Sequence, residues 1–134
     1  MAMTIPSITD VMTGQPITVD VSQSVSEAET QMANLGCRHL PVMKGEELVG
    51  VVSDRDMSLA LRLTGSSPTE MKVQDVYVEF PYRADIDDPL EKILNDMVEL
   101  QISSTLVTQN EKLVGIVTTT DICRAFQRCI EESK

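Results

Sequence analysis

Two short motifs carry the side chains with which this sequence could bind a ligand. Ser53 and Asp56 stand three residues apart, and so do Thr118 and Asp121. In each motif a hydroxyl and a carboxylate precede an apolar run with helical spacing, which predicts that both stand at the start of a helix. A carboxylate there can accept two hydrogen bonds from neighbouring sugar hydroxyls, and such charge-assisted bonds are strong. A hydroxyl and free amides at the same helix end can meet a phosphate.

The same motifs also have a purely structural interpretation. Ser or Thr followed three residues later by an acid is the pattern of a capping box, and an acid in the first turn suits the helix dipole. Two features favour binding. Capping boxes prefer the longer Glu or Gln, whereas both motifs have Asp, and Gly50 and Gly115 leave room for a flat base beside the preceding strand. Both interpretations stay open, and they are compatible with each other.

The motifs belong to a duplication that covers the whole chain. A shift of 65 residues, without a gap, places Leu48–Asp56 on Leu113–Asp121 and Met32 on Met97. We therefore divide the sequence into a first copy, residues 1–65, and a second copy, residues 66–134. A domain of about 60 residues buries only about 60% of its unfolded surface, so the copies are expected to share a core. The sequence predicts an α+β fold with two small sheets related by a pseudo-twofold axis.

Each copy shows the same order of elements: strand, helix, two strands joined by a turn, and a second helix. We expect Ser24 to cap the first helix of the first copy. We expect Asp88 to cap its counterpart, with Pro89 at the first helical position. The stretch 64–68, rich in Gly, Ser and Pro, predicts the connector between the copies. The expected strands are 18–22, 39–43, 48–52, 102–107 and 113–117, and the expected helices begin after residues 24, 53, 88 and 118.

Composition excludes several classes of function. The chain has 11 basic and 21 acidic side chains and a net charge of −10, which disfavours a nucleic-acid or an anionic-membrane surface. Its three cysteines form no CxxC pair and it has one His, so we expect reduced thiols and no metal site. The sequence has no P-loop and no GxGxxG motif, and Cys37 near His39 has no third group to orient it, so we expect no enzymatic activity. No apolar run reaches the roughly 18 residues of a membrane-spanning helix, and the N-terminus lacks the pattern of a signal peptide, so we expect a cytoplasmic protein.

At this point the sequence is similar to a known family. Both copies resemble cystathionine-β-synthase (CBS) domains, and the pair resembles a Bateman module, from about Ile8 to Phe126. The resemblance implies a regulatory module, often a homodimer, that binds AMP, ADP, ATP or sometimes S-adenosylmethionine. Three segments carry it: Cys37-Arg38-His39-Leu40-Pro41-Val42, Gly50-Val51-Val52-Ser53-Asp54-Arg55-Asp56 and Gly115-Ile116-Val117-Thr118-Thr119-Thr120-Asp121.

The resemblance implies a main ligand cleft between the copies. There the Asp-bearing end of the second copy is expected to face the basic strand of the first, so that Arg38 and His39 meet phosphate oxygens. Without the family, a solvated Arg and a partly buried His explain the same two residues. The residues expected at this cleft are Ile17, Thr18, Arg38, His39, Pro41, Gly115, Thr118 and Asp121.

A second, weaker cleft is implied on the opposite side of the pair. Ser103-Ser104-Thr105-Leu106 replaces the Arg-His-Leu-Pro segment in the second copy, so the basic pair is missing. We expect weaker binding, a different ligand or vacancy at this cleft. Its expected residues are Gly50, Ser53, Asp56, Tyr82, Arg83, Ser103 and Ser104.

Two functions follow from these expectations. In the first, the chain senses adenosine nucleotides and acts in trans on another protein, because no second domain is present in the sequence to be regulated. In the alternative, the fold serves as a dimerisation or adaptor module with vacant clefts.

Overall fold

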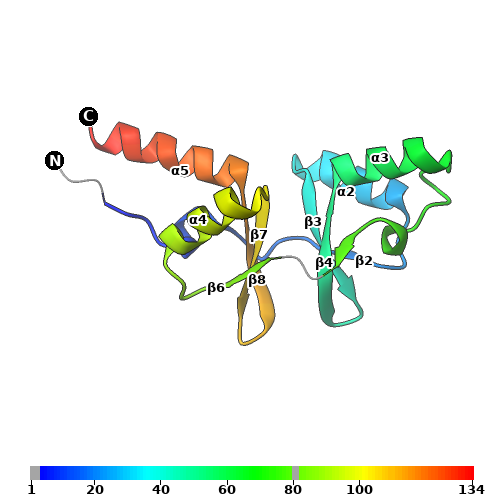
Figure 1. Ribbon diagram of the computed structural model, residues 1–134, viewed down its shortest axis with the longest axis horizontal. Helices are drawn as coiled ribbons and strands as arrows, with labels where there is room; N and C mark the ends of the chain where they lie inside the picture. The colour runs from blue at the N-terminus through cyan, green and yellow to red at the C-terminus, as the bar shows by residue number, and fades with distance from the viewer. Residues whose placement is uncertain (1–3, 80–81) are drawn as a thin grey trace. The chain divides into compact units, whose positions relative to one another are not determined.

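The duplicated sequence folds as an α+β structure with two four-stranded sheets (Figure 1). The structure is a computed structural model that describes residues 4–79 and 82–134. The chain forms two units: Ile17–Pro81 is here called the β3–β4 unit, and Met1–Pro16 with Tyr82–Lys134 is called the β7–β8 unit. The α+β class and the repetition of one set of elements confirm the prediction from the sequence.

The β3–β4 unit contains the first of the two sheets. Its elements are β2 (Val19–Asp20), α2 (Val25–Leu35), β3 (His39–Lys44), β4 (Glu47–Ser53), α3 (Asp54–Thr64), the 3-10 helix η1 (Val73–Asp75) and β5 (Val78–Glu79). The strand order is β2-β3-β4-β5, parallel between β2 and β3 and antiparallel elsewhere. The hairpin between β3 and β4 turns at Gly45, whose φ of +63° is the left-handed conformation that glycine adopts most easily.

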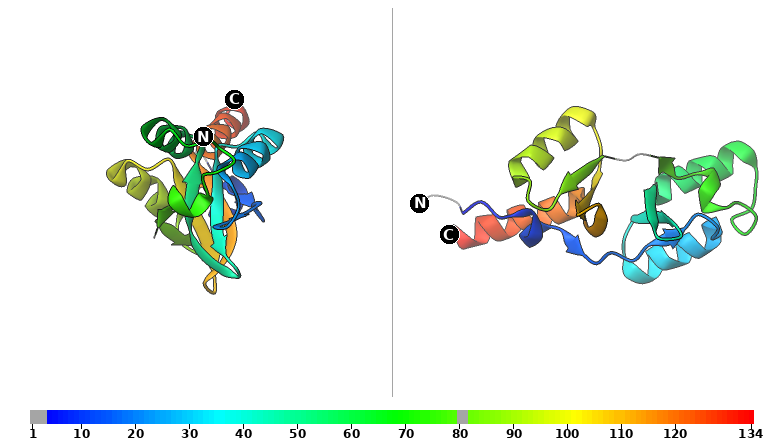
Figure 2. Two further views of the ribbon diagram at one scale, coloured as in Figure 1. Left: turned by 90° about the vertical axis from the view of Figure 1, so that its right-hand side faces the viewer. Right: turned by 90° about the horizontal axis from the view of Figure 1, so that it is seen from below.

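The β7–β8 unit repeats this arrangement. Its elements are α1 (Ile8–Val11), β1 (Thr13–Gly14), β6 (Arg83–Asp85), α4 (Leu90–Leu100), β7 (Ser104–Gln109), β8 (Lys112–Thr118) and α5 (Thr119–Glu132). The strand order is β1-β8-β7-β6, with β6 parallel to β7 and the other pairs antiparallel. The short helix α1 contacts α5, and Figure 2 shows the two helices beside each other.

Each sheet takes one of its two edge strands from the other copy of the repeat. β1 belongs to the first copy but pairs with β8, in the register Thr13↔Ile116. β5 belongs to the second copy but pairs with β4, in the equivalent register Val78↔Val51. The division into copies 1–65 and 66–134 therefore describes the duplication of the sequence, whereas the chain passes between the folded units after residues 16 and 81.

The predicted connector at residues 64–68 joins the two copies of the repeat in the sequence, but it does not join the two folded units. The stretch lies inside the β3–β4 unit. The carbonyl oxygen of Pro68 accepts a hydrogen bond from the amide of Ser26 at 2.9 Å, which ties the stretch to α2.

Helix starts follow the sequence closely, with one exception. Ser24 caps α2, because its hydroxyl accepts a hydrogen bond from the amide of Glu27 at 3.1 Å. Asp88 does not cap α4 as predicted. Pro89 occupies the cap position without a side-chain bond, and the Asp88 carboxylate instead accepts the amide of Asp85 at 3.0 Å. The aspartate therefore closes the turn before the helix.

Each unit has its own cluster of buried apolar side chains. The clusters include the side chains of Met32, Met57 and Met97, which are at most 6% exposed. With few aromatic side chains in the chain, Val, Ile, Leu and Met fill both cores. Within the described residues, no helix combines the length and the apolar character that crossing a bilayer requires.

Candidate ligand-binding site

The start of α5 holds two predicted site residues that bond each other, Thr118 and Asp121. Thr118 is the N-cap residue, and its hydroxyl accepts a hydrogen bond from the amide of Asp121 at 3.3 Å. In return, Oδ2 of Asp121 accepts the Thr118 amide at 2.9 Å and the Thr118 hydroxyl at 3.0 Å. Asp121 is only 7% exposed. Asp121 therefore closes a capping box although Glu or Gln is preferred there, and the structural interpretation of this motif holds.

A residue that the sequence analysis missed also bonds Asp121. The hydroxyl of Thr13, in β1, donates to Oδ1 of Asp121 at 3.1 Å. The duplication gave no signal for it, because the shift of 65 residues places Val78 on Thr13. The Asp121 carboxylate thus accepts three side-chain and backbone donors from two segments that are 108 residues apart.

The start of α3 is built differently from the start of α5. Ser53 is again the N-cap residue, and its hydroxyl accepts the amide of Asp56 at 3.1 Å. The Asp56 carboxylate accepts no hydrogen bond from any of the residues that the structure describes, and the side chain is partly exposed. The first motif therefore leaves a carboxylate available, whereas the second holds its carboxylate in place.

Gly50 and Gly115 stand beside the edge strands. A Cβ at position 50 would overlap with the backbone oxygen of Val78 and lie 2.5 Å from the Tyr77 ring. A Cβ at position 115 would overlap with the sulfur of Met12. Close packing is thus a sufficient reason for both glycines, and their proposed role beside a flat base stays a prediction.

The basic pair lies at the same end of its sheet as the start of α3. His39 opens β3 and is paired with Ser53 in the antiparallel register, and the carbonyl oxygen of Arg38 accepts the Asp54 amide at 3.0 Å. Arg38 is exposed and His39 is half-buried. This end of the β3–β4 unit therefore combines a guanidinium and an imidazole with the motif of Ser53 and Asp56.

Lowering the pH is expected to destabilise the protein through His39. Burial holds the pKa of its imidazole below the ordinary 6.5, although the carboxylates of Asp54 and Asp56 act in the opposite direction. The unfolded chain therefore binds this proton at a higher pH than the folded chain. The contribution of His39 to the free energy of unfolding is lost as the pH falls from about 6.5 towards the folded pKa. One group contributes at most about 1.4 kcal/mol per pH unit, and partial exposure reduces this.

Denaturant unfolding at several pH values between about 7.5 and 5 measures the effect, with His39→Gln as the comparison. The wild-type protein should lose more stability than the variant across this range. Asp10 and Asp20 do not disturb the comparison. Hydrogen bonds with Ser7 and Ser22 lower the pKa of these carboxyls below 3.8, so their contribution is lost only in stronger acid. Equal slopes for the two proteins would show that His39 titrates alike in both states.

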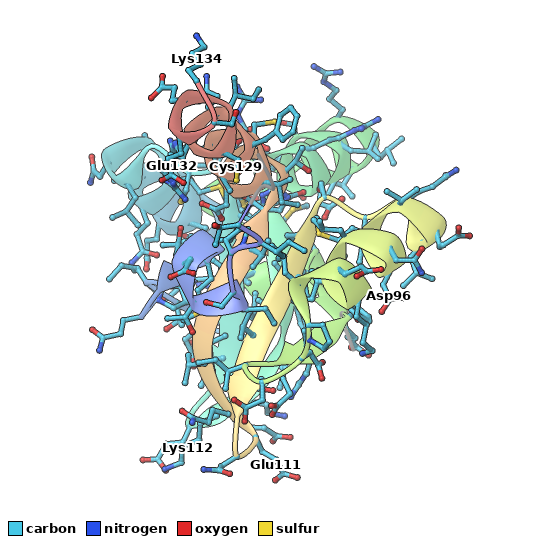
Figure 3. All side chains as sticks on the ribbon, turned by 90° about the vertical axis from the view of Figure 1, so that its left-hand side faces the viewer. Asp96, Glu111, Lys112, Cys129, Glu132 and Lys134 are labelled. Carbon is cyan, nitrogen blue, oxygen red and sulfur yellow. The ribbon has the colours of Figure 1, made fainter. Side chains whose placement is uncertain are left out.

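The remaining predicted residues lie in the β7–β8 unit. The carbonyl oxygen of Ser103 accepts the Thr119 amide at 3.1 Å, and Ser104 pairs with Thr118, so both serines lie at the start of α5. This is the opposite end of the hairpin from its tip, where Figure 3 shows Glu111 and Lys112. Arg83 opens β6.

Tyr82 bonds α4 rather than standing free for a ligand. Its hydroxyl donates to the Asp96 carboxylate on α4, which Figure 3 labels, and Lys92 lies 5.9 Å from the ring centre. Burial, followed by the bond with Asp96, raises the pKa of the phenol. A ligand contact of Tyr82 stays a prediction, and this structure assigns its hydroxyl a structural partner.

The structure thus collects the predicted residues into two sets. How the sets combine around a ligand, and the ranking of the two predicted clefts, stay predictions. Among the described residues, no three His, Cys, Asp or Glu side chains are grouped so as to hold a metal ion. One set consists of Ile17, Thr18, Arg38, His39, Pro41, Gly50, Ser53 and Asp56; the other consists of Tyr82, Arg83, Ser103, Ser104, Gly115, Thr118 and Asp121.

Solved structures with this arrangement are known. AcuB from Vibrio cholerae is 26% identical, with a TM-score of 0.84 over 96% of this chain and 95% of that one. The CBS domain pair of protein MJ0100, in complex with 5′-methylthioadenosine and S-adenosyl-L-methionine, is also 26% identical. Its TM-score is 0.82 over 92% of this chain and 98% of that one.

Sequence comparison agrees with the structural likeness. The protein YlbB of Bacillus subtilis (strain 168) is 34% identical over 122 residues, which are 90% of this chain and 82% of that protein. In two larger relatives that are named as enzymes, the matched region is only 24% and 20% of the protein. The family model for the CBS domain matches residues 8–63 and again residues 73–128. The chain therefore belongs to the CBS domain family, as a pair of CBS domains.

Proposed function

We propose that this CBS pair is a regulatory module that binds an adenosine-containing ligand through the starts of α5 and α3. In this proposal the module is a homodimer and acts on another protein in trans. The observation that carries the proposal is the buried carboxylate of Asp121 at the start of a helix, which Thr118 holds in place and to which Thr13 donates a further bond. The adenosine compounds bound to the CBS pair of MJ0100 support the choice of ligand class.

The chemistry of this site suits the sugar of a nucleoside. A carboxylate accepts hydrogen bonds only, and it can take the two donors of a ribose diol at once. At the start of α5 the amides of Thr118, Thr119 and Asp121 already donate hydrogen bonds within the described residues. The amide of Thr120 is the one that can meet an anionic group. If Arg38 and His39 meet the same ligand, as the resemblance implies, AMP, ADP or ATP is favoured over S-adenosylmethionine, because their phosphates gain a guanidinium partner.

Thermal unfolding in the presence of single compounds tests the proposal. AMP, ADP, ATP and S-adenosylmethionine are added in turn to the wild-type protein. A compound at 100 times its dissociation constant should raise the free energy of unfolding by about 2.7 kcal/mol. GMP serves as the control, because it carries the same sugar and phosphate with another base. If no adenosine compound shifts the transition at millimolar concentration, the proposal is wrong.

One observation favours the alternative, an adaptor without ligand. The hydrogen bonds of Asp121 to Thr118 already explain why an acid stands at this position. Exposed apolar side chains such as Leu63 and Phe126, 77% and 59% exposed, could then serve protein contacts. In that case, the oligomeric state and stability of the protein would not respond to any of the compounds.

A further inference from the structure

We infer that Thr13 is an internal competitor for the carboxylate of Asp121, so that a ligand must release β1 in order to bind there. The inference rests on the proposed function and extends it from binding to the regulation of the same site. Its basis is the bond from Thr13 Oγ1 to Asp121 Oδ1, 3.1 Å long. The donor is a hydroxyl, which is the group that a sugar would present to the same oxygen.

The number of acceptor positions on the carboxylate requires a displacement. A carboxylate offers about four positions to donors. Oδ2 already accepts the amide and the hydroxyl of Thr118, and Oδ1 accepts Thr13. A single position is left, whereas a vicinal diol needs two. One of the three donors must therefore leave when a diol binds.

Thr13 is the donor that can leave at the lowest cost. The amide of Thr118 is fixed at the helix start, and the Thr118 hydroxyl also accepts the amide of Asp121 as the cap of α5. Thr13 instead lies in β1, a strand of two residues that pairs with β8 at the edge of the sheet. Few bonds hold such a strand, so it opens more readily than a helix cap.

Release of β1 would act directly on the connection between the two units. The amide of Gln15 donates to the carbonyl oxygen of Val114 at 3.1 Å, and Gln15 has a φ of +47°, which is uncommon for a residue other than glycine. After Pro16 the chain continues into the β3–β4 unit. Binding at Asp121 thereby shifts the equilibrium between a held and a released connection, which is a route for the signal.

The equivalent site at Asp56, in the β3–β4 unit, lacks this competitor. Val78 in β5 stands where Thr13 stands in β1, and it pairs with β4 in the equivalent register. Valine has no donor, and the described residues donate no hydrogen bond to the Asp56 carboxylate. The duplication therefore places one site under competition and leaves the other without it.

Calorimetric titration of Thr13→Val tests the inference. Wild type, Thr13→Val and Thr13→Ser are each titrated with AMP, ADP, ATP and S-adenosylmethionine. For the compound that saturates the protein, Thr13→Val should bind about 3- to 10-fold more tightly, because no hydroxyl has to be displaced. Thr13→Ser keeps the hydroxyl and should bind like wild type. Weaker or unchanged binding by Thr13→Val would overturn the inference, since Thr13 would then orient Asp121 instead.

Hydrogen exchange on the wild-type protein gives a second readout that needs no variant. Saturation with the same compound should speed amide exchange at residues 13–15, whereas unchanged or slower exchange there overturns the inference even if Thr13→Val does not fold. The two proposals fail in different ways. If a compound binds saturably, but Thr13→Val does not bind it more tightly and exchange at residues 13–15 is not faster, only the inference about Thr13 is wrong. The absence of saturable binding to wild type and Thr13→Val removes the proposed function as well.

Discussion

Replacing Asp121 by Ala is expected to weaken the binding of an adenosine compound about 100-fold. In the proposed complex its carboxylate accepts two sugar hydroxyls, and a hydrogen bond to a charged group contributes about 1.5–3 kcal/mol. Part of this gain is offset, because Thr13 or Thr118 must give up a bond that the free protein has. A net loss of about 2.7 kcal/mol corresponds to two decades in the dissociation constant, which isothermal titration calorimetry measures directly.

Asp56→Ala is expected to weaken the binding of the adenosine compound by less than about 10-fold. Comparing it with Asp121→Ala separates two physical arguments. The resemblance implies that Arg38 and His39 contact the ligand that Asp121 binds. The stronger site should therefore contain the carboxylate of Asp121. The free structure alone would favour Asp56, whose carboxylate accepts no bond from the described residues and needs no displacement. An equal or larger loss for Asp56→Ala would show that an available acceptor matters more than the basic pair.

A loss of stability has to be separated from a loss of binding. Asp121→Ala removes the acceptor of three hydrogen bonds and so opens the capping box of α5, which costs roughly 1–2 kcal/mol of folding free energy. Asp10→Ala is the matched control, because Asp10 closes a capping box with Ser7 in the same unit. The control should lose stability and keep its affinity. Asp121→Asn, which preserves the shape of the side chain, should lose affinity with a smaller loss of stability.

The sequence predicts those elements whose signals are local. The hairpin at Gly45, the cap at Ser24 and the helix start at Thr118 each depend on residues within three or four positions of each other. The period of the apolar residues and the cap residues therefore indicated the main helices and the hairpin strands, with Asp88 as the one wrong cap. The strands β1 and β5 were missed because two residues are too few for a period to be recognised.

The details that distinguish the two sites are not local, and the sequence does not reveal them. The contact of Thr13 with Asp121 joins residues 108 positions apart and has no counterpart in the other copy. The closing of one capping box and not the other depends on where an Asp side chain turns, which its type does not decide.

Thr105 replaces Leu40 of the first copy. Its hydroxyl is buried without a hydrogen-bond partner among the described residues.

Gly50→Ala is expected to destabilise the β3–β4 unit by about 2–3 kcal/mol, whereas Gly115→Ala should cost the β7–β8 unit less than about 1 kcal/mol. At position 50 the new Cβ overlaps with the backbone oxygen of Val78, so β5 itself must move away from β4. At position 115 the overlap is with the sulfur of Met12, the flexible part of a side chain that can rotate, and the backbone oxygen of Thr13 lies at 3.1 Å. The two substitutions are chemically identical and occupy equivalent positions of the duplication.

Native-state hydrogen exchange of both variants measures the two costs separately, because the amides of β4 and β8 report on different units. Gly50→Ala should lower the protection of amides along β4 and leave that of β8 unchanged. Gly115→Ala should lower the protection of β8 only slightly. Denaturant unfolding gives the same order for the whole chain. A larger cost at position 115 would mean that Met12 cannot rotate away. Met12 is the residue directly before β1, so an immobile Met12 would also hold β1 in place. Thr13 could then not be released by a ligand, as the proposed competition requires.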